Sequence, residues 1–360
     1  MKTNLIRLLT YAAMQISFIY IPVFARNLGI SDVGIGIMVA LYSSALFFSS
    51  YIFGRASDRY GRKIFIIVGL LVATIAFFLQ IFVNDFTSLI IIRTLVGFCI
   101  GIYPSALVAC VYEMRKDMGK FASFGSLGWF IGLTISAVIS TYFAIKDIFI
   151  LSSLFSFLAF LVAFTLEPIK HKPIKVPLFP LKILKKNKSV YLSVLIRHSG
   201  AYIIWTFWPL YLISIGANLF WVGIIEAVNS FVQFLVMFAI TYRFKTILLL
   251  KVGFLISAVT FFSYTLASNF WQILPAQVLL GTSWGLLYVG ALRYVCERND
   301  EKATVSGMLD SVLNLSALIG PILATILLSL GNYRIGMYVA SLLALISFFV
   351  FNFFESKNSL

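Results

Sequence analysis

Long apolar stretches separated by short polar ones run through the whole chain. A helix needs about 20 apolar residues to cross the hydrocarbon core of a membrane, and stretches of this length recur twelve times. The pattern therefore predicts an all-α membrane protein with twelve transmembrane helices. The predicted spans are 5–25, 31–53, 64–83, 87–111, 121–142, 147–166, 190–214, 218–241, 247–267, 270–295, 303–329 and 333–354.

The longest polar interruption is Glu167–Ser189, which contains four prolines and seven lysines. Proline breaks helices, and lysine is costly in lipid, so this segment cannot span the membrane. We expect it to be a cytoplasmic linker. The predicted organisation is an N-terminal six-helix bundle at 1–166, a linker at 167–189 and a C-terminal six-helix bundle at 190–360.

The two halves are related by an internal repeat. A shift of 187 residues aligns their beginnings, and from the fourth span onward the shift is 184, because the loop after the second span is shorter in the second copy. A duplicated six-helix unit predicts two pseudo-symmetric bundles. The matched pairs are Pro22 and Pro209, Gly29 and Gly216, Gly36 and Gly223, Ala40 and Ala227, Phe86 and Phe270, Gly97 and Gly281, Gly101 and Gly285, and Glu113 and Glu297.

Composition supports a membrane protein and predicts its orientation. The chain is 61% hydrophobic and 11% charged, against about 25% charged residues in soluble domains. Its net charge of +15 comes from residues in short loops rather than from one stripe, so we expect no nucleic-acid partner. Of the 28 Lys and Arg residues, 23 fall on the side of the amino terminus and three on the other side. The positive-inside rule then places both termini in the cytoplasm and the protein in the cell membrane.

The sequence offers little for enzyme chemistry. It contains no phosphate-binding G-x-x-x-x-G-K-[ST] loop, and its three cysteines and two histidines have no metal-ligand spacing. We therefore expect no catalytic residues, no cofactor and no bound metal.

The loop Gly54–Lys63 reads G-R-A-S-D-R-Y-G-R-K and places four cations and a carboxylate between two apolar runs. Because lipid tolerates neither sign of charge, this loop must lie at a membrane surface. Its pattern, G-x-x-x-D-R-x-G-R-K, resembles the loop signature of the major facilitator superfamily. The resemblance covers essentially the whole chain and implies that family's fold, with a solute bound between two halves that open to alternate sides.

The same resemblance implies a gate at this loop. In the family, the matching Asp and Arg residues hold the cytoplasmic ends of helices together, and the Asp faces the positive end of the eleventh helix, where a carboxylate gains about 0.3–1 kcal/mol. The alternative is that the cations only anchor a short turn. The gating candidates are Gly54, Asp58, Arg59, Gly61, Arg62, Lys63, Glu113 and Arg115.

Arg93 lies inside the fourth span, where a cation is costly and should face a cavity or a partner. With Gly97 and Gly101 it resembles the family's fourth-helix motif, whose Arg is associated with proton transfer. The two glycines have a plainer interpretation as sites of close helix packing.

Three more ionisable residues are candidates for ion coupling. Glu226 is a carboxylate well inside the eighth span, where it could exchange a proton between two aqueous sides. Asp310 lies nearer the cytoplasm and is either a coupling residue or a carboxylate that pairs in the gate. His198 is either a proton relay or a hydrogen-bonded packing residue.

Polar and aromatic side chains at helical spacing in mid-span are candidates for lining a solute cavity, although Trp and Tyr also gather at membrane interfaces. These candidates are Tyr11, Gln15, Arg197, Tyr202, Trp205, Asn229, Gln233, Trp284, Tyr288 and Asn314.

The direction of transport stays open. Efflux antiporters of the family typically carry G-P-x-x-G-G in the fifth helix, which Gly128–Ala137 does not match, whereas Phe124–Trp129, F-G-S-L-G-W, resembles the fifth helix of sugar and nucleoside proton symporters. We expect a monomeric secondary transporter in a lipid bilayer that moves a small organic solute and is coupled to protons or another ion. The alternatives are an uncoupled facilitator and a non-transporting membrane sensor on the same fold.

Overall fold

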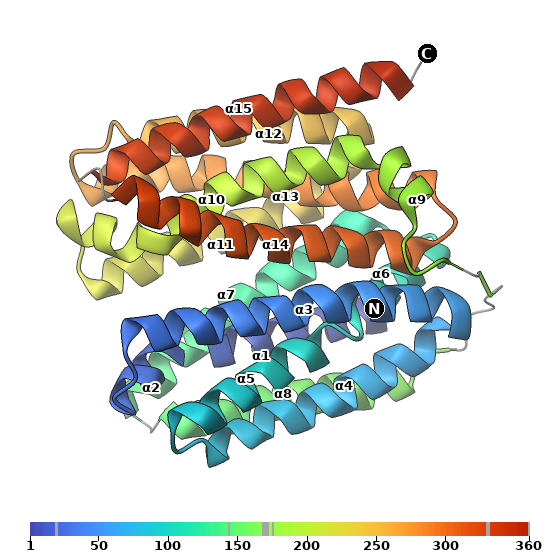
Figure 1. Cartoon of the computed structure of the whole chain (residues 1–360), viewed down its shortest axis with the longest axis horizontal. Helices are drawn as coiled ribbons and strands as arrows, with labels where there is room; N and C mark the ends of the chain where they lie inside the picture. Colours follow the sequence, from blue (N-terminus) through green and yellow to red (C-terminus); the bar gives the residue numbers. More distant parts are fainter. Residues whose placement is uncertain (19–20, 143–144, 168–172, 175, 329–331, 359–360) are drawn as a thin grey trace. The chain divides into compact units, whose positions relative to one another are not determined.

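A computed structural model describes residues 1–360 with the exception of 19–20, 143–144, 168–172, 175, 329–331 and 359–360. The regular elements that it describes are helices (Figure 1). Parts of the predicted spans 5–25 and 303–329 and of the predicted linker 167–189 lie outside the described residues.

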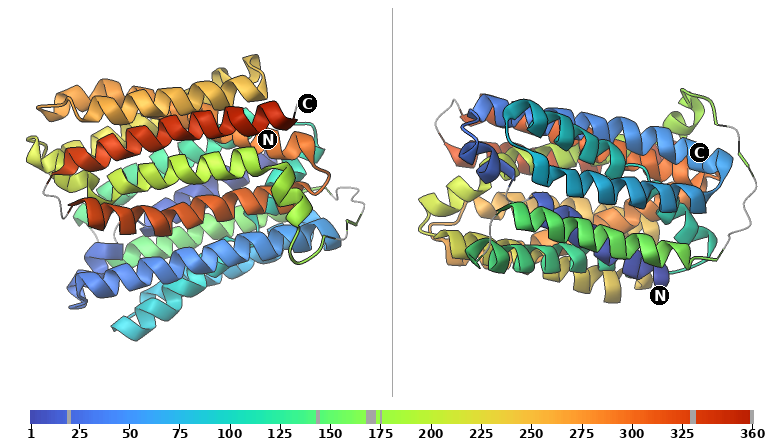
Figure 2. Two further views of the ribbon diagram at one scale, coloured as in Figure 1. Left: turned by 45° about the horizontal axis from the view of Figure 1, so that its top comes forward. Right: turned by 90° about the horizontal axis from the view of Figure 1, so that it is seen from below.

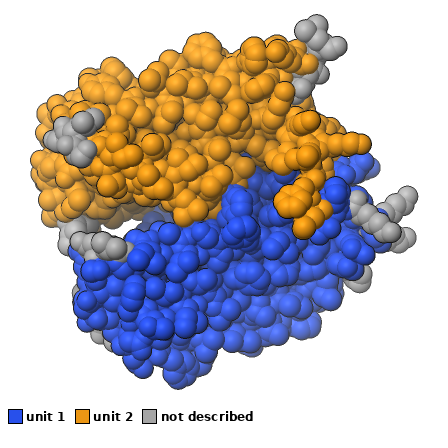
Figure 3. Space-filling model, in the orientation of Figure 1, with its two compact units in different colours: residues 1–177, 300–311 blue, residues 178–299, 312–360 orange. Residues whose placement is uncertain are grey.

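The chain divides into two compact units, coloured separately in Figure 3. Unit 1 comprises Met1–Pro177 and Asp300–Ser311, and unit 2 comprises Leu178–Asn299 and Val312–Leu360. Helix α14 (Lys302–Leu328) therefore supplies its first turns to unit 1 and the remainder to unit 2. The bundle boundaries inferred from the sequence, at 166 and 190, stay a prediction.

Unit 1 is a helical bundle (Figure 1, Figure 2). In it α1 packs against α7 and α8, α4 packs against α5 and α8, and α3 packs against α5. Buried apolar residues that include Ile21, Phe24, Met38, Leu89 and Phe149 form one of its cores. The helices are α1 (Lys2–Phe18), α2 (Ile21–Asn27), α3 (Asp32–Tyr60), α4 (Arg62–Leu79), η1 (Gln80–Phe82), α5 (Phe86–Ile100), α6 (Pro104–Glu113), α7 (Met118–Tyr142) and α8 (Ile145–Phe164).

Unit 2 repeats this arrangement. Its α10 packs against α15, α12 packs against α13 and α15, and α11 packs against α13, around a core that includes Phe207, Phe261 and Tyr264. Besides the remainder of α14, its helices are α9 (Leu181–Lys186), α10 (Lys188–Ser214), α11 (Leu219–Ala239), η2 (Thr241–Arg243), α12 (Thr246–Tyr264), η3 (Phe270–Gln272), α13 (Ile273–Arg298) and α15 (Tyr333–Asn358).

The helices account for the apolar pattern of the sequence. Nine helices within the described residues are long and apolar enough to cross a membrane. The other three predicted spans correspond to α1 with α2, to α7 and to α10. The all-helical membrane fold is confirmed, and the count of twelve crossings is consistent with these helices.

Equivalent glycines make equivalent contacts in the two units, which confirms their pseudo-symmetry. A Cβ added at Gly97 would lie 2.5 Å from the carbonyl oxygen of Tyr42, and one added at Gly281 would lie 2.8 Å from that of Asn229. Tyr42 and Asn229 are themselves repeat mates, because they are 187 residues apart. Close packing of α5 on α3 therefore recurs as packing of α13 on α11, and it explains why these positions carry glycine.

The turns before these helices repeat as well. Gly29 and Gly216 both have a positive φ, 75° and 92°, a conformation that favours glycine. Further on, the side chain of Asp85 accepts a bond from the N–H of Ser88, and that of Asn269 accepts one from the N–H of Gln272, so repeat mates cap both helix starts.

Three local features differ from the sequence prediction. The charged stretch Gly54–Lys63, predicted as a loop, is helical except at Gly61, because α3 runs to Tyr60 and α4 begins at Arg62. The span predicted at 87–111 is two helices, α5 and α6, because the helix breaks before Pro104, which cannot donate a backbone hydrogen bond; its repeat mate Tyr288 allows α13 to run unbroken. The segment predicted as a linker contains the short helix α9, whose Ile183 is buried.

Candidate functional site

Asp58 lies at the centre of a charged cluster in unit 1, called here the Asp58 cluster. The side chain is 0% exposed. Its Oδ1 accepts hydrogen bonds from Arg62 Nη1 at 2.6 Å and from the Ala303 N–H at 3.3 Å. Its Oδ2 accepts from the Thr304 N–H at 2.6 Å and from the Thr304 hydroxyl. These N–H groups belong to the first turn of α14, where backbone donors have no partner within the helix.

The backbone on both sides allows this close approach. Gly61, with φ 103°, ends α3 and starts α4, so Asp58 and Arg62 face each other across the turn. A Cβ added at Gly54 would lie 2.6 Å from the carbonyl oxygen of Ala303, and one at Gly307 would lie 2.4 Å from that of Ser50. Glycine is thus required on both helices for α3 and the start of α14 to touch.

Arg62 extends the cluster to α6. Its Nη2 and Nε donate to Glu113 Oε1 at 2.7 and 3.2 Å, so one guanidinium joins the carboxylates of Asp58 and Glu113. In unit 2 the mates of Arg62 and Glu113 are Thr246 and Glu297, and the Thr246 hydroxyl lies 2.9 and 3.0 Å from the two carboxylate oxygens. The ion pair between Arg62 and Glu113 in unit 1 is therefore replaced in unit 2 by a hydrogen bond from a neutral hydroxyl to a carboxylate.

The other gating candidates lie outside the cluster. Arg59 and Arg115 are exposed, and Lys63 donates to the carbonyl oxygen of Leu166 at 2.6 Å. Contacts between the linker and this region were not predicted. The Ile174 N–H donates to the Asp58 carbonyl oxygen at 2.9 Å, and Arg55 Nε donates to that of Val176 at 2.6 Å.

Arg93 is 3% exposed and has neutral partners. Its Nη1 donates to Ser17 Oγ at 3.1 Å and to Gln80 Oε1 at 2.9 Å, and its guanidinium lies 4.7 Å from the centroid of the Tyr42 ring. Ser17 Oγ also donates to Gln80 Oε1 at 3.0 Å. Among the described side chains, no carboxylate forms an ion pair with Arg93.

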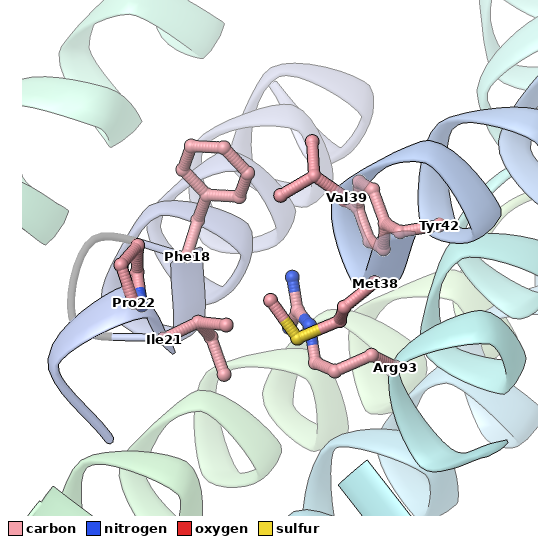
Figure 4. Close-up of a pocket in the computed structure, with 7 residues that line it drawn as sticks. All are labelled: Phe18, Ile21, Pro22, Met38, Val39, Tyr42 and Arg93. Atoms are coloured by element: carbon pink, nitrogen blue, oxygen red, sulfur yellow. The ribbon is translucent and has the colours of Figure 1, made fainter. Parts of the chain in front are cut away.

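A cavity of about 30 Å³ adjoins this guanidinium. Figure 4 shows the Arg93 side chain reaching among apolar side chains from α1, α2 and α3. Apart from Arg93, the cavity is lined by Phe18, Ile21, Pro22, Met38, Val39 and Tyr42. Arg93 was predicted to face a cavity or a partner. In the structure it has hydrogen-bond partners and also lines a cavity.

Arg7 is one of the 23 cations counted on the side of the amino terminus, and its side chain is 2% exposed. Its guanidinium lies 3.8 Å from the centroid of Tyr11 and 5.1 Å from that of Phe121, and it interacts electrostatically with Asp310 on α14. The structure thus brings the candidates Tyr11 and Asp310 to one buried arginine. Gln15, one turn after Tyr11, contacts the α7 backbone near Gly132.

An aromatic group surrounds His198 in unit 2. The imidazole stacks on Trp284 at a centroid distance of 4.8 Å and meets Tyr202 and Trp205 edge-on at 5.2 and 5.3 Å. Trp284 in turn stacks on Tyr288 at 5.5 Å. Five residues proposed from the sequence therefore form one contiguous surface from α10 and α13.

Arg197 is 1% exposed and adjoins this aromatic group, with its guanidinium 5.3 Å from the centroid of the Trp284 ring. Its Nε donates to Ser257 Oγ at 2.9 Å, its Nη2 lies 3.4 Å from Ser283 Oγ, and its Nη1 lies 3.4 Å from His198 Nδ1. The guanidinium is therefore held by hydroxyl groups of α12 and α13. The two serines were not predicted, since isolated serines in apolar spans give no signal.

Glu226 is half-buried on α11 and lies near Trp208 and Tyr264. The Trp208 indole N–H and the Tyr264 hydroxyl are buried beside it. One turn later on α11, Gln233 Nε2 donates to Asn229 Oδ1 at 3.1 Å. Asn314 is half-buried on α14. In the described part of the chain, no group of three or more His, Cys, Asp or Glu side chains could hold a metal ion.

Comparisons with known proteins place this geometry in context. The sequence matches the family described as Major Facilitator Superfamily over residues 3–312. It is 32% identical over 162 residues to the multi-drug resistance efflux pump PmrA of Streptococcus pneumoniae, covering 42% of this chain and 40% of that protein. It thus matches about two fifths of the length of that relative.

Two further likenesses extend over nearly the whole chain. An uncharacterized MFS-type transporter of Methanocaldococcus jannaschii, MJ1560, is 23% identical over 353 residues, 91% of each chain. The crystal structure of the human organic anion transporter MFSD10 (TETRAN) superposes with a TM-score of 0.81 over 97% of this chain and 98% of that one, at 16% identity. At that identity the likeness shows the fold alone.

Proposed function

Because the chain belongs to the major facilitator superfamily, we propose that it is a secondary transporter that exports a small organic solute by alternating access, driven by proton entry. The observation that carries this proposal is the contact between the Asp58 carboxylate and the first turn of α14. Export is supported by the likeness to the multi-drug resistance efflux pump PmrA, which matches part of this chain.

The Asp58 cluster is the proposed cytoplasmic gate. Arg62 links the carboxylates of Asp58 and Glu113, while Asp58 also receives the free N–H groups of α14. These bonds hold only while α14 lies against α3, so they stabilise one conformation and must break in the other. Such a contact shifts a conformational equilibrium, as alternating access requires.

Glu226 and Asp310 are the proposed proton carriers, because a carboxylate within a membrane span is costly unless it is protonated or paired. Asp310 interacts electrostatically with the Arg7 cation. Glu226 has no basic ion-pair partner among the described residues and is the stronger candidate for coupling. The termini are proposed to lie in the cytoplasm on the charge asymmetry of the loops.

Transport in proteoliposomes, with and without an imposed pH gradient, tests the proposal. A screen of solutes by thermal shift on the purified protein would first supply a substrate. Solute accumulation that follows the pH gradient would support proton-coupled transport. Flux that only equilibrates the solute would indicate a facilitator, and binding without flux would indicate a sensor.

A further inference from the structure

The short helix α9 has an outward face that is both apolar and basic. Ile183 is buried, and Leu181 and Lys185 point to the opposite side, because residues two apart lie about 200° around a helix. Leu181 is 61% exposed and Leu184 is 40% exposed. Lys182 and Lys185 are exposed and form no hydrogen bond or ion pair with the described residues.

The residues on either side of α9 have the same character. Phe179 is 77% exposed, and Lys188 is exposed with its Nζ 4.4 Å from the centroid of the Phe354 ring. Residues 178–188 contain four lysines and no acidic residue, a charge of +4. Such apolar side chains are costly in water, and the lysines are costly in hydrocarbon. The boundary between the two suits both.

Hydrogen bonds fix α9 to the end of α13. The side-chain amides of Asn187 and Asn299 bond to each other in both directions, Nδ2 to Oδ1, at 3.2 and 2.9 Å. Asn187 Nδ2 also donates to the carbonyl oxygen of Ile183 at 2.9 Å, and Lys186 Nζ donates to that of Arg298. Lys186 is thus used within unit 2, whereas the outward lysines face away from it.

The position of α9 in the chain sets its depth in a membrane. The next helix, α10, begins two residues after α9 ends and has 27 residues, so it is about 40 Å long. The hydrocarbon core is about 30 Å thick, and about 40–45 Å with the headgroup regions. The start of α10 therefore lies among the headgroups. Helix α9 runs across this end of α10 rather than along it, and lies at the same level (Figure 1, Figure 2).

We infer that the outward face of α9, together with Phe179, binds anionic phospholipids. The apolar side chains enter the boundary of the acyl chains, and the ammonium groups of Lys182 and Lys185 contact the headgroups. A zwitterionic headgroup carries its own cation, so the lysines favour an anionic lipid, each by about five-fold. This inference goes beyond the proposed function, and its failure would leave that function intact.

Contact quenching by brominated lipids tests the inference. In protein whose three native cysteines are replaced, Phe179→Cys is labelled with bimane, an apolar fluorophore in place of an apolar ring. The protein is reconstituted in equimolar phosphatidylglycerol and phosphatidylcholine, with bromine on the acyl chains of one lipid or the other. We expect both lipids to quench, with an association constant at least about five-fold higher for phosphatidylglycerol. No quenching, or equal quenching by both lipids, would overturn the inference.

Paired substitutions identify the lysines responsible. Lys182→Gln with Lys185→Gln should lower the preference for phosphatidylglycerol to less than about two-fold, and Lys182→Arg with Lys185→Arg should keep it. The control, Lys116→Gln with Lys120→Gln, removes the same charge from two exposed residues at the start of α7 in unit 1 and should leave the preference unchanged. A preference that survives the first pair of substitutions, or that the control pair lowers as much, would overturn the inference.

Discussion

Replacing Asp58 by Asn is expected to open the proposed cytoplasmic gate. Asp58 Oδ2 accepts from the Thr304 N–H at 2.6 Å and from the Thr304 hydroxyl, while Oδ1 accepts from Arg62 at 2.6 Å and from the Ala303 N–H at 3.3 Å. An Asn side chain keeps one acceptor oxygen and puts an NH₂ donor in place of the other. Either Arg62 or Thr304 then faces a donor instead of an acceptor.

The size of the effect follows from what is left unpaired. A buried donor that loses its acceptor costs about 1–3 kcal/mol, and breaking a buried ion pair by removing one charge costs about 3–5 kcal/mol. Water can solvate the same groups once α14 leaves α3, so most of this cost falls on the closed form. A shift of about 3 kcal/mol raises the ratio of open to closed molecules roughly 100-fold.

Cysteine labelling measures this ratio. Ser306 on α14 is fully buried within unit 1, and its hydroxyl lies 3.4 Å from the carbonyl oxygen of Ser105. Ser306→Cys, in protein whose three native cysteines are replaced, should react with N-ethylmaleimide at a rate set by the open population. Asp58→Asn should speed this reaction by roughly two orders of magnitude.

Asp117→Asn is the matched control. Asp117 caps α7 by accepting from the N–H groups of Gly119 and Lys120 at 2.7 and 3.0 Å, and Asn caps a helix equally well. It makes the same chemical change without removing an acceptor from α14, so labelling should not change. Equal labelling rates in the Asp58 and Asp117 variants would refute the gating role of the Asp58 cluster.

Gly54→Ala should raise labelling of the same cysteine, because its Cβ would lie 2.6 Å from a backbone oxygen of α14, whereas Gly36→Ala, with nothing within 4 Å, should leave it unchanged. Glu226→Gln should abolish accumulation driven by a pH gradient in proteoliposomes and preserve solute exchange at equal pH; continued accumulation would exclude Glu226 as the proton carrier. Gly29→Ala and Gly216→Ala should each lower Tm by a similar few degrees, because a left-handed conformation costs an L-residue about 1–2 kcal/mol. A loss at only one of the two would contradict their equivalence.

The apolar and charged pattern of the sequence was enough to predict the helices, the repeat and a charged segment at Gly54–Lys63, although that segment is helical except at Gly61 and not a loop. The bilayer imposes these features one segment at a time: a spanning segment must be apolar and helical, and charges must lie at its ends or be paired. The repeat could likewise be recognised without coordinates. Positions 97 and 281 are both glycine because each lies close to the backbone of a neighbouring helix. The break before Pro104 was missed because the apolar run continues through it.

Which polar groups meet could be learned only from the folded chain. The partners of Asp58 on α14 are about 245 residues away in the chain, and nothing in an apolar sequence fixes which faces of two helices turn toward each other. Arg7 was counted from the sequence among the cations on the side of the amino terminus. In the structure it is buried against Tyr11 and Phe121. Arg93 is held by Ser17 and Gln80. Charge in a membrane span predicts that a side chain is functional, but its partners depend on helix rotation and packing.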